Sequence, residues 1–190
     1  MTTLTNEIAS IATAWTPVPH YAARFRDLIM TATLGQVEAA SVWYLEAQNV
    51  AEDIASIMGT NLEIAASIVS AFSPRERWAS NVAKAYAFAN GLPVSGLTNN
   101  LNMANAAMVK GFDALNGQKT NAFARAIAGD DNAVVIDVWM MRAAGMETDS
   151  PNKSQYNECA NAVRVVADEF GITARTAQAL IWIIVRGSAE

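Results

Sequence analysis

Two side chains that could take part in nucleophilic and acid–base chemistry, Lys119 and Asp137, lie eighteen positions apart in the second half of the chain. Lys119 follows a turn at residues 115–118 and is predicted to begin a helix, where free backbone amides can hold a phosphate. The positive end of the helix dipole disfavours a protonated amine there, which would help a lysine act as a nucleophile. Asp137 follows the apolar residues 133–136 and is predicted to cap the next helix, whose amides would hold its carboxylate in place. Taken singly, Lys119 is also consistent with a solvated surface lysine, and Asp137 with an ordinary helix cap.

The elements that position this pair are predicted to be helices. A chain of 190 residues that is 52% hydrophobic can bury a core, and only 10 Gly and 5 Pro interrupt it. The segment that begins at Ser73 has the pattern of a capped helix start, because Pro74 would stand at the first helical position and Glu76 would complete a capping box. Few or no strands are expected. Helices are predicted over residues 6–15, 21–34, 36–58, 61–72, 74–90, 99–109, 119–128, 138–144, 154–170 and 173–186.

Charge and cysteine content restrict the partners and the compartment. The formal net charge is −5, but residues 71–129 carry six basic and two acidic side chains, so this segment could meet a nucleic acid. The single cysteine, Cys159, forms no internal disulfide and no four-cysteine cluster, which fits a cytoplasmic protein. The N-terminal residues lack the pattern of a signal peptide, and no apolar run reaches the length of about 18 residues that spans a membrane.

The lysine and the aspartate also lie in segments that resemble a known signature. Residues 115–120 (Leu-Asn-Gly-Gln-Lys-Thr) and residues 135–142 (Val-Ile-Asp-Val-Trp-Met-Met-Arg) resemble the hairpin and the catalytic aspartate of the helix-hairpin-helix (HhH-GPD) DNA glycosylases, such as endonuclease III and 8-oxoguanine DNA glycosylase. The resemblance implies that Lys119 attacks C1′ of a flipped, damaged or modified nucleotide in double-stranded DNA and that Asp137 assists. It further implies a monomeric enzyme with base-excision and lyase activity and no cofactor, since the cysteines of an iron–sulfur cluster are absent. The DNA backbone would be held by Gly117, Gln118, Thr120, Arg75 and Arg77.

Two further segments extend the resemblance to base recognition. Residues 68–73 are similar to the helix end that carries the residue wedged into the DNA stack, which places Phe72 at the wedge position. Residues 177–182 resemble the C-terminal helix that reads the base, in which Gln178 would bind the flipped base and Trp182 would stack on it. These two lie four positions apart and so share one helical face. If Gln178 is buried among the apolar residues of this helix, its amide needs a hydrogen-bond partner, whereas core packing is the simpler role for Phe72 and Trp182.

The resemblance implies an all-α fold of about ten helices in two lobes. Residues 36–128 would form a central helical bundle with the hairpin, and residues 1–35 with 129–190 the second lobe of one glycosylase-like unit. The hairpin has one glycine where the family has two and is shorter, and Trp139 stands where a histidine is frequent after the aspartate.

Two alternative functions stay open. The first follows from residues 73–75 (Ser-Pro-Arg) with Trp78 and Asn81. This pattern resembles that of phage-encoded relatives, some of which are proposed to act in thymine-hypermodification pathways. The same lysine and aspartate would then modify a base without excising it. A catalytically inactive DNA-binding relative is the non-enzymatic alternative, which would bind DNA without cleaving it.

Overall fold

The computed structural model describes residues 20–148 and 150–187. These residues form helices joined by short connections and contain no strand, so the predicted all-α fold of about ten helices is confirmed for this part of the chain. The helix predicted over residues 6–15 lies outside the described residues. The elements are α2 (Ala22–Met30), α3 (Leu34–Met58), α4 (Leu62–Ala71), α5 (Trp78–Ala89), α6 (Thr98–Lys110), the 3-10 turn η1 (Gly111–Ala114), α7 (Gln118–Ile127), α8 (Val138–Ala144), α9 (Lys153–Phe170) and α10 (Ala174–Arg186).

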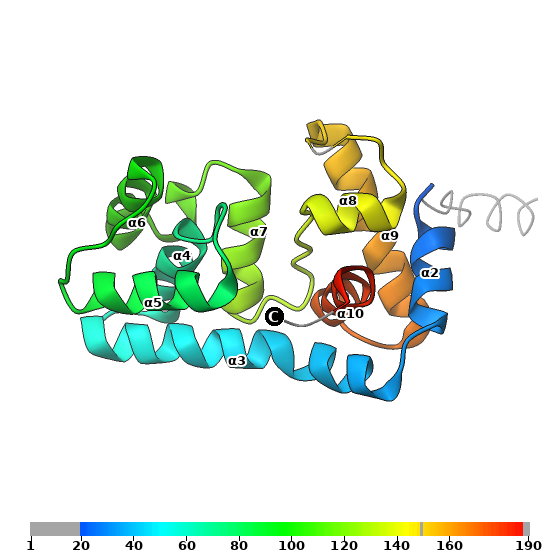
Figure 1. Ribbon diagram of the computed structural model, residues 1–190, viewed down its shortest axis with the longest axis horizontal. Helices are drawn as coiled ribbons and strands as arrows, with labels where there is room; N and C mark the ends of the chain where they lie inside the picture. The colour runs from blue at the N-terminus through cyan, green and yellow to red at the C-terminus, as the bar shows by residue number, and fades with distance from the viewer. Residues whose placement is uncertain (1–19, 149, 188–190) are drawn as a thin grey trace, which may run out of the picture.

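The helices form two groups that lie side by side along the long helix α3 (Figure 1). One group consists of α4 to α7, and the other of α2 with α8, α9 and α10. Helix α3 packs against α4, α5 and α7 of the first group and against α10 of the second. It therefore belongs to both groups, although the sequence analysis assigned it to the central bundle alone. Within the described part of the chain, no single helix is both long and apolar enough to cross a membrane, and α3 and α4 meet these criteria only as a pair bent by 112°.

Local signals explain where α3 begins and ends. The Thr33 side chain accepts a hydrogen bond from the Gln36 amide, and Gln36 accepts one from the Thr33 amide, so that the two form a capping box. Gly59 ends the helix in the left-handed conformation, with a φ of 62°. Along the helix, Ala47 and Ala51 are buried completely, and their small side chains let the backbone of α3 approach its neighbours closely.

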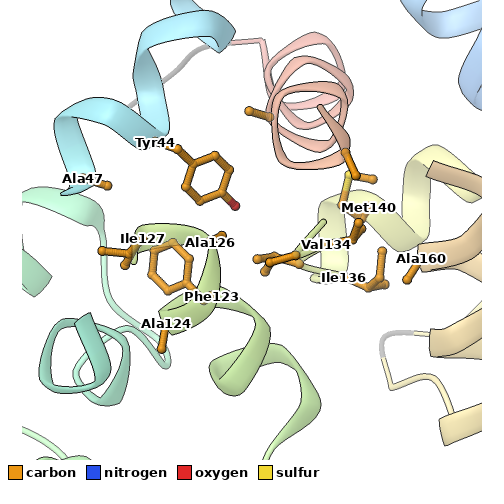
Figure 2. Close-up of a cluster of buried hydrophobic side chains, with 14 of the residues drawn as sticks. Tyr44, Ala47, Phe123, Ala124, Ala126, Ile127, Val134, Ile136, Met140 and Ala160 are labelled. Atoms are coloured by element: carbon orange, nitrogen blue, oxygen red, sulfur yellow. The ribbon is translucent and has the colours of Figure 1, made fainter. Parts of the chain in front are cut away.

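The two groups share one hydrophobic core where they meet. Tyr44 of α3, Phe123 of α7 and Val134 of the connection between α7 and α8 point toward one another in this region (Figure 2). Ile136 and Met140 continue the core toward α9. This shared core fixes the position of one group relative to the other, and with it the position of any side chain at their junction.

The helix start predicted at Ser73 is wrong. The chain forms a turn in which Arg75 has a φ of 65°, and α5 begins only at Trp78. Such a φ does not occur inside a right-handed helix. The Ser73 hydroxyl caps nothing, and Glu76 instead accepts a hydrogen bond from Ser80 at 2.7 Å and pairs with Lys84. The ion pair with a residue eight positions away replaces the capping box that the local pattern indicated.

The thiol of Cys159 gives a test of the packing of α9. Cys159 is 0% exposed, and burial raises the pKa of its thiol from 9.0 to about 12. Only the unfolded chain loses this proton near pH 9, so the free energy of unfolding falls as the pH rises from 9 toward 12, by about 1.4 kcal/mol at pH 10. Urea denaturation at pH 8, 9 and 10 measures this decline. The decline should be smaller in Cys159→Ala, and an equal decline in both proteins would contradict a buried thiol.

Candidate functional site

A cavity of about 370 Å³ lies at the junction of the two helix groups. Its walls come from α3, the turn before α5, α5 itself, α7, the start of α8 and α10. The cavity brings together Lys119 and Asp137, which the sequence analysis paired, with Gln178 near the other end of the chain. Six aromatic side chains contribute to its lining, and these are Trp43, Tyr44, Trp78, Phe123, Trp139 and Trp182.

Asp137 is fixed by three hydrogen bonds. It caps α8 as predicted, with Oδ1 accepting from the backbone amides of Trp139 at 2.9 Å and Met140 at 3.0 Å. Its Oδ2 accepts from the indole Nε1 of Trp182 at 3.0 Å. A carboxylate offers about four lone-pair positions, so one position on Oδ2 is left for a ligand.

The connection that leads to Asp137 is held by Tyr156 of α9. The Tyr156 hydroxyl donates to the carbonyl of Val134 at 3.1 Å and accepts from the amide of Ile136 at 3.2 Å. Burial raises the pKa of Tyr156 to about 12, so the phenol keeps its proton and remains a donor at neutral pH. These bonds pair two buried backbone groups in a segment without regular secondary structure. They therefore fix the position of the segment that leads to Asp137.

Lys119 reaches the cavity from the other helix group. It is the second residue of α7, its side chain is exposed, and it makes no hydrogen bond or ion pair with the described residues. The amine is therefore free to meet a ligand, whereas Asp137 is held rigidly. An amine without a partner among the described residues and a fixed carboxylate that line one cavity can contact the same bound molecule.

The hairpin before Lys119 uses its side chains within the protein. The Thr120 hydroxyl donates to the Gly117 carbonyl at 3.0 Å, and Thr120 is only 9% exposed. The Gln118 side chain donates to Asn157 of α9 at 3.1 Å. No side chain caps α7, so a phosphate bound at this hairpin would meet the backbone amides of the first helical turn rather than the side chains of Gln118 or Thr120.

Phe72 does not occupy the wedge position predicted for it. Its side chain is 2% exposed, and its ring lies 5.7 Å from the ring of Phe88. It borders a smaller cavity of about 170 Å³ beside α6 instead of the cavity that holds Lys119. Burial of an apolar ring stabilises the fold, so the contacts of Phe72 support the core interpretation.

Gln178 has the hydrogen-bond partner that its burial required. It is 4% exposed, and its Oε1 accepts from the Tyr44 hydroxyl at 2.5 Å. Burial, and then the charge of Asp137, raise the pKa of Tyr44 well above its usual range, so Tyr44 stays a donor. Because Oε1 is taken, the free end of the Gln178 amide is Nε2, which has no partner among the described residues.

Trp182 contributes to the site by its indole N–H rather than by an open ring face. The N–H holds Asp137, and the Arg186 guanidinium lies 4.5 Å from the centre of the Trp182 ring. Trp43 lies on another side, with its ring centre 6.0 Å away. The stacking role predicted for Trp182 therefore competes with these neighbours, and positioning of Asp137 is what the contacts support.

One family model matches residues 9–189, and it is described as a family of unknown function, DUF7178. The chain belongs to the DUF7178 family. No curated protein and no solved structure matches it.

Several residues that line the cavity were given no role at the site by the sequence analysis. Trp43 is the centre of an aromatic cluster, with its ring 5.5 Å from that of Trp78 and 6.0 Å from that of Phe123. Asn81 and Ser73 also line the cavity. The sequence analysis named Ser73, Trp78 and Asn81 only as a phage-type pattern and gave them no role at the site. The spacing of Trp78 and Asn81, which puts both on one face of α5, was the available signal.

The lining of the cavity carries more positive than negative side chains. Arg75 and Arg77, both predicted to hold DNA, line it together with Lys119 and Arg186. The acidic lining residues are Asp137 and Glu76, and Glu76 is paired with Lys84. The described residues contain no group of three or more His, Cys, Asp or Glu side chains that could hold a metal ion.

Proposed function

We propose that this protein is a DNA glycosylase with lyase activity, which binds double-stranded DNA and takes a flipped, damaged or modified nucleotide into the cavity. The observation that carries the proposal is that Lys119 and Asp137 line one cavity although they come from different helix groups. The aromatic lining suits a planar base, and the open amide of Gln178 can donate to it.

The reaction follows from the groups present. The neutral amine of Lys119 attacks C1′ of the sugar, the C1′–N glycosidic bond breaks, and its electron pair leaves with the base, which takes up a proton. The C1′–O4′ bond then breaks, and the amine proton passes to O4′ as the ring opens, which gives a Schiff base between Lys119 and C1′. Loss of the C2′ proton forms a C2′–C3′ double bond and breaks the C3′–O bond, whose electron pair leaves with the 3′ phosphate. The carboxylate of Asp137 stabilises the positive charge that develops on the sugar, because Asp137 lines the cavity that takes the nucleotide.

The cations at the cavity support DNA as the carrier of the base. Arg75 and Arg77 are exposed and line the cavity, and each contact of such a cation with a phosphate releases counterions. Binding should therefore weaken steeply with salt, in spite of the net charge of −5.

Borohydride trapping tests the proposal. The protein is incubated with duplexes that contain 8-oxoguanine, oxidised or hydroxymethylated pyrimidines, uracil or an abasic site, and borohydride is added to reduce any Schiff base. A covalent protein–DNA adduct on at least one duplex is expected. The absence of an adduct on every duplex, with folded protein that binds DNA, would contradict the lyase reaction and favour the inactive binder.

Trp182→Phe tests how Asp137 is positioned. The variant keeps a ring but deletes the N–H that holds Oδ2, and the loss of a hydrogen bond to a charged group should slow adduct formation about tenfold. Trp139→Phe is the matched control, because the Trp139 indole N–H has no partner among the described residues. Equal rates for both variants would show that the Trp182 bond does not matter to the reaction.

A second candidate, modification of the base without excision, is favoured by the polar groups at the turn before α5. The Ser73 hydroxyl is buried without a partner, and Arg75 and Arg77 lie beside it on the cavity. These groups could bind a substituent that a bare base lacks. On this alternative the duplexes bind, but no base is released and no adduct is trapped.

A further inference from the structure

Asn81 is a buried polar side chain without a hydrogen-bond partner. It is 2% exposed, it lies on α5 facing the cavity, and its Oδ1 is buried and unpaired. No other described residue bonds to its amide nitrogen. The hydroxyl of Ser73, on the turn before the same helix, is also buried and unpaired.

Such a pair of unpaired groups is costly to the fold. A buried polar group without a partner loses its hydration and gains nothing in return. Because both groups line the cavity, a ligand can satisfy them, and the cost in the empty protein becomes a gain on binding. This separates Asn81 from buried polar residues that serve the fold, such as Asn100, which donates to the Pro74 carbonyl.

The unpaired amide groups in the cavity indicate which base they fit. Asn81 can present one N–H and its oxygen side by side whichever way its amide is turned, and Gln178 can present an N–H, while its oxygen already accepts from the Tyr44 hydroxyl. The complement of this set is an edge with two acceptors and one donor. Cytosine and uracil or thymine present two acceptors and one donor along their pairing edge. Guanine presents one acceptor and two donors, and adenine presents one of each.

We propose that the cavity selects a pyrimidine base, with Asn81 as the specificity-determining residue that forms two hydrogen bonds to the pairing edge of the base and Gln178 donating the third. This inference rests on the proposed function for the entry of a flipped nucleotide, and it adds the class of base and the residue that reads it. It does not depend on whether the base is then excised or modified.

Binding to a matched set of duplexes tests the base preference. Each duplex carries one central 2′-fluorinated nucleotide, which resists glycosidic cleavage, opposite an abasic analogue, and the base is cytosine, uracil, 5-hydroxymethyluracil, adenine or guanine. Quenching of tryptophan fluorescence reports binding, since four tryptophans line the same cavity as Asn81. The pyrimidine duplexes should bind about tenfold more tightly than the purine duplexes, the value of one bidentate pair. Equal or tighter binding of the purine duplexes would overturn the proposal.

Asn81→Leu separates recognition from structure. Leucine has a similar volume and no polar atoms, so the variant should bind all duplexes within about twofold of one another, while its Tm rises by about 3 °C because the unpaired amide is gone. A lower Tm with the pyrimidine preference intact would mean that Asn81 serves the fold, and would overturn its assignment. Asn102→Ala, an exposed asparagine on α6 outside the cavity, is the control and should change neither quantity.

The trapping experiment, run in parallel, distinguishes this inference from the proposed function. An adduct without a pyrimidine preference overturns the inference and leaves the glycosylase in place. A pyrimidine preference that Asn81→Leu removes, without any adduct, supports the base site and overturns excision. No binding to any duplex overturns both.

Discussion

The substitution Lys119→Gln is expected to abolish the borohydride-trapped adduct and to reduce strand cleavage by about three orders of magnitude or more. The amide of glutamine cannot form a Schiff base, and no other lysine lines the cavity among the described residues. Adduct yield on gel electrophoresis and single-turnover cleavage rates measure the loss. Because Lys119 is exposed and bonded to nothing in the described structure, its replacement should change the free energy of unfolding by less than about 0.5 kcal/mol.

Lys110→Gln is the matched control for this substitution. Lys110 is an exposed lysine at the end of α6 and does not line the cavity. The control removes the same charge and should keep full trapping. If Lys119→Gln still formed the adduct at the wild-type rate, the nucleophile would have to be another amine. The proposed reaction of Lys119 with the help of Asp137 would then be wrong.

The helices could be predicted from the sequence where their ends are set by local contacts. Asn152 and Gln155 form a capping box at the start of α9, and Thr173 caps α10 through the amide of Thr176. These bonds span three residues, so the pattern that predicts them is visible in the sequence. Asp137 belongs to the same class, since its bonds to the first amides of α8 are local.

The start of α5 was not predicted in this way, because the residues of its local pattern make other contacts. Ser73, Pro74 and Glu76 have the residue types of a capping box, yet Glu76 pairs with Lys84 and the chain turns at Arg75 with a positive φ. The capping-box pattern covers only four consecutive residues, so it does not include the ion pair of Glu76 with Lys84.

Only part of the candidate site could be predicted from the sequence, namely the pair Lys119 and Asp137 and the buried Gln178. The spacing of Lys119 and Asp137 drew attention to the pair, and the apolar surroundings of Gln178 required a partner for it. The partner of Gln178 is Tyr44, which lies 134 positions away in the sequence, and the contact of Trp182 with Asp137 spans 45 positions. A local sequence pattern does not predict either contact. Trp43 and Asn81 face the cavity because two helix groups meet there, a fact of tertiary packing that helical periodicity does not contain.

The substitution Asp137→Asn is expected to slow adduct formation about 10²–10⁴-fold, the range that a positioned acid–base group contributes. Asparagine is as good a helix cap as aspartate, so the start of α8 should persist. The new amide has only one oxygen, however. If that oxygen accepts from the Trp139 and Met140 amides, the amide nitrogen must face the Trp182 N–H, and two donors then meet where a bond existed.

This conflict allows stability and chemistry to be separated by a double-mutant cycle. Asp137→Asn alone should lower the free energy of unfolding by about 1–3 kcal/mol, since it breaks the bond to Trp182 and leaves that N–H unpaired. Adding Trp182→Phe removes the opposing donor, so the double variant should recover part of that stability. Adduct formation should not recover, because the carboxylate itself is still missing. If the rate returned together with the stability, Asp137 would act only by holding the fold in place, and the charge would have no part in the reaction.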